Sequence, residues 1–127
     1  MGRAELATNV DRPESTLDAL MQAVVCKGRL GWRPHSRKMV VIATDQGFHT
    51  ALDGKLLGVL TPNDGECHLD AEGWYTLAKD LDYPSVSHIG KVVKENAVTT
   101  LFLVGSATSR CRVGIGPLWA LKWEANS

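Results

Sequence analysis

The strongest constraint on the fold is an alternation of amphipathic helices with short apolar strands. After Ser15 and Thr16, apolar residues recur at helical spacing as far as Val25, which predicts a helix that glycines end shortly afterwards. Residues 39–44 (MVVIAT) are a continuous, partly β-branched run, typical of a strand covered on both faces.

The same pair of elements follows further along the chain. Ser85 opens a second apolar stripe that Asn96 ends, and residues 99–104 (TTLFLV) predict a second buried strand. This alternating order of helices and strands favours an α/β fold with a mostly parallel sheet flanked by helices. Because ligands bind such sheets at the carboxyl ends of the strands, Asp45 is expected at a functional rim.

Length and charge limit the function classes. The 127 residues, 44% of them apolar, suffice for one domain with a core. Fourteen basic and fourteen acidic residues leave no net charge that would call for nucleic acid or an anionic membrane surface. We expect neither a leader peptide nor a membrane span within these residues.

The three cysteines do not decide the compartment. Cys26, Cys67 and Cys111 are widely spaced and form no CxxC or zinc pattern. One disulfide plus one free thiol and three free thiols are both compatible with this spacing.

Oxygen-bearing side chains crowd the segment before the first helix. Asn9, Asp11 and Glu14 surround Pro13 within residues 9–14 (NVDRPE), and oxygen ligands of this kind suit Mg²⁺ or Ca²⁺. Alternatively, Asp11 or Glu14 only stabilises the helix N-terminus. Asp45 could converge with Glu14 across the helix, or could simply initiate a turn.

A hydrolytic site is the weakest interpretation of these residues. It would use Asp11, Glu14, Asp45 and His49, but no motif supplies a nucleophile, an activated water or a closed pocket. A lone His near a turn is usually solvated or packed. We therefore expect no enzymatic activity.

Several blocks of the chain, in order, resemble the I-like domain of integrin β subunits, which has a von Willebrand factor A-like α/β fold. The blocks are residues 9–14 (NVDRPE), 17–22 (LDALMQ), 25–26 (VC), 31–33 (GWR), 44–45 (TD), 53–56 (DGKL), 62–68 (PNDGECH) and 82–85 (DYPS). The resemblance implies an incomplete, Rossmann-type domain over residues 1–104. Residues 105–127 are expected to be a divergent tail, to which we assign no function.

The resemblance implies three neighbouring cation sites, with a central Mg²⁺ whose open position accepts an acidic residue of the ligand. Glu14 would bind the central ion and bridge to an adjacent Ca²⁺ site. Asn9, Asp11 and the Pro13 carbonyl would complete this side of the Ca²⁺ site. Asp45 would belong to the outer shell of the central ion and to the third site in some states.

Further expectations also follow only from the resemblance. The backbone around Asn9 and Arg12 would line the entry of the acidic ligand, and Cys26 and Cys67 would form a disulfide, which favours an extracellular setting. The parent protein would be a single-pass plasma-membrane receptor that pairs with an α subunit, binds acidic extracellular ligands and signals.

Departures from the family pattern leave a second interpretation open. The family's Asp-x-Ser-x-Ser metal loop does not occur in these residues, so half of the cation cage is missing, and Arg12 replaces a usually smaller residue. The alternative is a truncated soluble product with no ligand binding of its own.

Overall fold

The computed structural model describes residues 13–105 and the backbone of residues 112–115. In chain order the elements are α1 (Thr16–Val25), α2 (Lys27–Leu30), β1 (Lys38–Thr44), the 3-10 helix η1 (Asp53–Leu57), α3 (Val86–Glu95), β2 (Val98–Val104) and β3 (Arg112–Ile115). None of the helices in these ranges has the length and apolarity needed to cross a membrane.

Helices α1 and α3 form where the apolar stripes predict them. α1 begins directly after Ser15, although the Ser15 side chain makes no capping hydrogen bond. α3 is capped by Ser85, whose hydroxyl accepts a hydrogen bond from the His88 amide at 3.1 Å, and it ends at Asn96. Both helix predictions are confirmed.

Strands β1 and β2 are parallel neighbours, as the sequence predicts. Their register runs from Lys38 opposite Val98 to Thr44 opposite Val104. β3 adds an antiparallel strand along the outer side of β2, within the segment where the sequence indicates no element. Gly114 lies inside this four-residue strand, and glycine is depleted in strands, which weakens the signal.

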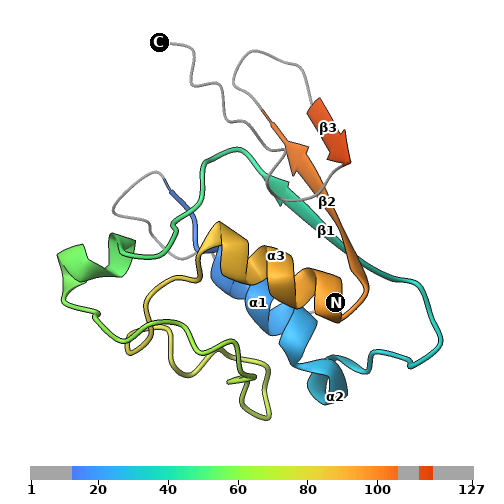
Figure 1. Ribbon diagram of the computed structural model, residues 1–127, viewed down its shortest axis with the longest axis horizontal. Coiled ribbons are helices and arrows are strands. Elements are labelled where there is room, and N and C mark those ends of the chain that lie inside the picture. Colours follow the sequence, from blue (N-terminus) through green and yellow to red (C-terminus); the bar gives the residue numbers. More distant parts are fainter. Residues whose placement is uncertain (1–12, 106–111, 116–127) are drawn as a thin grey trace.

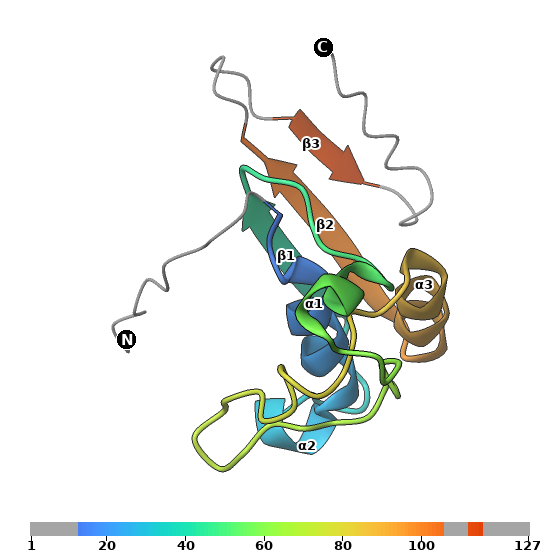
Figure 2. The same ribbon diagram turned by 90° about the vertical axis from the view of Figure 1, so that its left-hand side faces the viewer.

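The core lies between the two long helices and one face of the sheet. α1 and α3 run side by side along that face (Figures 1 and 2). Their apolar stripes meet the inward side chains of β2. The buried cluster consists of Leu17, Leu20, Met21, Val24, Ile89, Val92, Val93, Val98 and Phe102.

The expectation that residues 39–44 are covered on both faces is wrong for the described part of the chain. Val40 and Ile42 pack against the core, whereas Met39 and Val41 are 57% and 52% exposed on the opposite face. Burial alternates along β1 because α1 and α3 lie on the same side of it. A continuous apolar run therefore does not by itself show that both faces are buried.

Candidate functional site

The candidate site is the rim formed by the carboxyl ends of β1 and β2. The Thr44 carbonyl at the end of β1 accepts a hydrogen bond from the Gly105 amide at 2.9 Å. Asp45 follows immediately, with its Cβ 3.7 Å from the position that a Cβ on Gly105 would occupy. The exposed Asp45 carboxylate therefore stands at the strand-end rim.

Glu14 is held beside the chain that continues from this rim. Its amide donates to the Gly47 carbonyl at 2.9 Å, and its carbonyl accepts from the His49 amide at 3.0 Å. These two bonds form a parallel bridge between Glu14 and Phe48. Glu14 is thus paired with residues 47–49, which follow Asp45 closely along the chain.

The predicted ligand set is only partly within the described residues. Pro13 and Glu14 are half-buried next to the rim, and Asp45 is exposed on it. Asn9, Asp11 and Arg12 lie outside the described residues. Among residues 13–105, no three His, Cys, Asp or Glu side chains converge in a way that could hold a metal ion.

His49 is engaged in packing at the base of the following loop. Its ring stacks on Tyr83 with centroids 4.6 Å apart, and Nδ1 lies 3.3 Å from an Asp53 carboxylate oxygen. These contacts fix His49 between two loop segments. They agree with the interpretation of this residue as a packed side chain.

A buried carboxylate that the sequence interpretation did not single out organises the loop leading into η1. Asp82, 6% exposed, accepts hydrogen bonds from the amides of Leu52, Gly54 and Tyr83 at 2.6–2.9 Å. A Cβ on Gly54 would lie 2.6 Å from an Asp82 carboxylate oxygen, so this contact requires glycine. In the sequence, Asp53 and Gly54 are typical of a turn at this place. No local pattern identifies Asp82, 28 residues further along, as the residue that binds it.

Four leucines around η1 are exposed to solvent. Leu52, Leu56, Leu57 and Leu60 are between 62% and 93% exposed. Figure 1 shows η1, in green, standing out from the body of the molecule at the end remote from the α2 to β1 connection. Such clustered apolar exposure is typical of a surface that another protein covers. The sequence showed these leucines only as short apolar pieces between turns.

Asp18, on α1, is almost fully buried, with only 5% of the residue exposed. Its carboxylate accepts a hydrogen bond from the side-chain amide of Asn63 at 3.4 Å. Burial, and then the negative charge of Asp82, raise the pKa of Asp18 to about 6, while His49 opposes this shift. The folded chain therefore holds the Asp18 proton more tightly than the unfolded chain does.

The sign of this linkage gives a testable pH dependence. As pH rises from the ordinary Asp pKa through the folded value of about 6, Asp18 progressively lowers the free energy of unfolding. Asp18→Asn keeps an acceptor for Asn63 but removes the charge, so the decline in stability between about pH 5 and about pH 7.5 should flatten. Urea unfolding at both pH values measures it.

The exposed Asp80 provides the control. Asp80→Asn should leave the pH dependence of the unfolding free energy as it is in the unmodified chain. An unchanged slope in Asp18→Asn would contradict the assignment of this linkage to Asp18.

Comparison with known proteins places these features in a family. The family model for the integrin beta chain VWA domain matches residues 1–115. Integrin beta-PS of Drosophila melanogaster is 50% identical over 101 residues, which is 80% of this chain and 12% of that protein. Integrin beta pat-3 of Caenorhabditis elegans is 47% identical over 102 residues, 80% of this chain and 13% of that protein. Human integrin beta-7 is 42% identical over 107 residues, which is 84% of this chain and 13% of that protein.

These matches cover most of the chain but only about an eighth of each relative's length. The matched part is the von Willebrand factor A-like domain, and its α/β character agrees with the parallel β1 and β2 and with the two helices packed on them. The chain belongs to the integrin β family, as part of its von Willebrand factor A-like domain.

Proposed function

We propose that the chain is the ligand-facing part of a cell-surface adhesion receptor, in which a divalent cation at the β1 rim binds an acidic residue of an extracellular ligand. The parent protein pairs with an integrin α subunit and signals across the plasma membrane. This function is one of binding, so it needs no nucleophile or proton-transfer group.

The observation that supports this proposal is the pairing of Glu14 with the segment that follows Asp45 at the end of β1. Two backbone hydrogen bonds hold Glu14 beside the chain that leaves β1, where Asp45 is exposed. Two carboxylates and the Pro13 carbonyl are hard oxygen donors, which Mg²⁺ and Ca²⁺ prefer. Asn9 and Asp11, which directly precede them in sequence, would add further oxygens.

An incomplete protein shell suits this role. Mg²⁺ binds through few protein ligands and keeps other positions for water or substrate groups. A ligand carboxylate can take such a position, and Asn9 and Arg12 would border its approach. The chain's own residues therefore hold and orient the cation, and the ligand completes its coordination.

The alternative proposal is a product that binds no ligand by itself. It is favoured by the lack of a three-residue metal cluster within the described ranges. Both proposals assume the same fold. They differ in one point, which is whether the residues at the rim can bind a cation by themselves.

Calorimetric titration of the purified chain with Mg²⁺ and Ca²⁺ tests the rim. With part of the ligand set missing, affinity should be no tighter than about millimolar, as in the weakest protein sites. Glu14→Ala should abolish the remaining heat, while Glu72→Ala, on an exposed loop residue, should leave it unchanged.

Two other outcomes are informative. Micromolar binding that depends on Glu14 would contradict the half-site argument and make the chain a complete binding unit. No measurable binding in the unmodified chain would favour the product that binds no ligand.

Pairing with an α subunit would use the leucines around η1. Leu56 and Leu57 are 93% and 82% exposed on a helix whose start is fixed by the hydrogen bonds of Asp82 to Leu52 and Gly54. An apolar projection that is anchored at its start loses less conformational entropy on burial against a partner than an unanchored loop does.

Leu56→Asp combined with Leu57→Asp should therefore weaken association with an integrin α-subunit ectodomain by at least about tenfold, because charges would be buried without partners. Co-expression followed by affinity capture and a titration measures the change. Leu30→Asp, on α2 and 50% exposed, is the matched control and should bind normally. Equal loss in both variants would contradict the assignment of the surface.

A further inference from the structure

The connection through α2 to β1 carries a concentrated positive charge on an otherwise acidic chain. Residues 27–38 (KGRLGWRPHSRK) contain five of the chain's fourteen Lys and Arg residues and none of its fourteen Asp and Glu residues. The rest of the chain holds nine basic and fourteen acidic residues. We refer to residues 27–38 as the basic loop.

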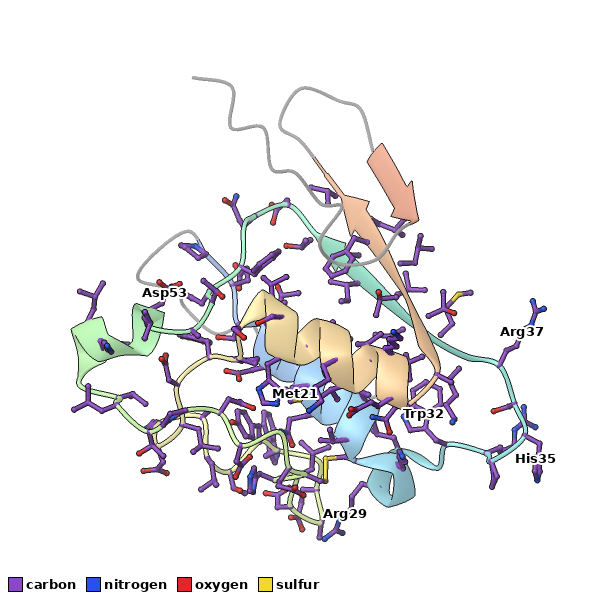
Figure 3. The ribbon with its side chains drawn as sticks, in the orientation of Figure 1. Met21, Arg29, Trp32, His35, Arg37 and Asp53 are labelled. Atoms are coloured by element: carbon purple, nitrogen blue, oxygen red, sulfur yellow. A yellow bond between two sulfur atoms is a disulfide. The ribbon has the colours of Figure 1, made fainter. Side chains whose placement is uncertain are left out.

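The three arginines of the basic loop face solvent. Arg29, Arg33 and Arg37 are exposed, as is His35 between the last two. Within residues 13–105, no carboxylate forms an ion pair with any of these three arginines. Figure 3 shows His35 and Arg37 pointing outward from the end of the loop. The positive charges of the three arginines are therefore available to an external anion.

The backbone that carries these side chains is anchored to the core. The Trp32 indole donates a hydrogen bond to the Ala23 carbonyl of α1 at 2.8 Å. The Ser36 hydroxyl donates to the Arg33 carbonyl at 3.0 Å and closes a turn between the two arginines. Lys38 Nζ reaches the Asn96 carbonyl at 3.4 Å. An anchored loop pays less ordering entropy on binding than a free one.

Acidic residues lie near the α2 end of this surface. The disulfide between Cys26 and Cys67 joins the start of α2 to a loop that carries Asp64, Glu66, Asp70 and Glu72. Figure 3 shows Arg29 on that side and His35 and Arg37 at the other end. Exposed charges more than about 10 Å apart are largely screened at physiological salt. The turn from Arg33 to Arg37 therefore carries the exposed basic side chains that lie at the end away from these acidic residues.

We propose that the basic loop binds a sulfated polysaccharide of the glycosaminoglycan type. Arginine guanidinium groups form paired hydrogen bonds with planar or tetrahedral oxyanions. The Cys26–Cys67 disulfide favours an oxidising, extracellular setting. There, sulfated polysaccharides are the repeating polyanions that a short basic surface can engage, and the chain's neutral overall charge confines such binding to this loop.

This surface is separate from the candidate cation rim. The basic loop enters β1 at Lys38, whereas Asp45 follows the other end of the same strand. Seven strand residues separate the two ends by roughly 20 Å. Loss of one activity therefore need not affect the other, and the inference does not depend on cation binding.

Binding of the full chain to immobilised heparin at several salt concentrations tests the proposal. Arg33→Ser combined with Arg37→Ser should lower affinity by about tenfold or more and reduce the slope of log affinity against log salt by about 2. Lys79→Ser combined with Lys91→Ser removes the same charge from exposed positions elsewhere and should change neither quantity. Circular dichroism checks that all variants keep their helices.

The proposal also requires that binding depend on the sulfate groups of the polysaccharide. Chemically desulfated heparin should fail to compete, and a heparin oligosaccharide should protect Arg33 and Arg37 of the unmodified chain from dicarbonyl modification. Equal loss in both double variants, or equal competition by desulfated heparin, would overturn the proposal. So would self-association that the arginine substitutions abolish and heparin cannot displace, because the loop would then bind a second copy of the chain.

Discussion

The structure depends on the burial of helix α1. Leu17, Leu20, Met21 and Val24 are each at most 1% exposed, and even the polar Gln22 is 4% exposed. Because α1 is buried on most of its circumference, the segments bonded to it are held in defined positions. Apolar burial of this extent is the dominant favourable term in folding, at about 25 cal/mol per Å² of apolar surface.

Each surface proposed to bind a partner is attached to α1 or to a segment next to it by specific contacts. The Gln22 side chain donates to the Glu66 carbonyl and accepts from the His68 amide, which holds the acid-rich loop against the helix. At the end of α1, Cys26 extends the same attachment through its disulfide, and Ala23 receives the Trp32 indole of the basic loop. Before its first turn, Glu14 bridges to Phe48, on the chain that continues from the rim. The rim and the basic loop are therefore positioned by opposite ends of one buried helix.

Sequence periodicity was sufficient for the elements whose stripes are long and regular. α1, α3 and the parallel pair β1 and β2 follow from local spacing, because burial of one helix face repeats every three to four residues. The exposure of Met39 and Val41 could not be deduced, since a run of apolar residues has no alternation to distinguish the two faces. The role of Asp82 was also hidden, because its hydrogen bonds to Leu52 and Gly54 cross about thirty residues of irregular chain. For the candidate site, the strand-end rule predicted Asp45 at the end of β1, where it lies, while the pairing of Glu14 with Phe48 depends on a backbone bridge that leaves no mark in composition.

The central claim is that α1 is the element on which the other surfaces depend, and native-state hydrogen exchange measures this directly. The amides of Leu20, Met21 and Val24 should exchange only through global unfolding and share its free energy, whereas those of η1 should exchange much faster through local opening. If the α1 amides exchanged as fast as those of η1 while the sheet stayed protected, α1 would be a peripheral helix and the account would be wrong.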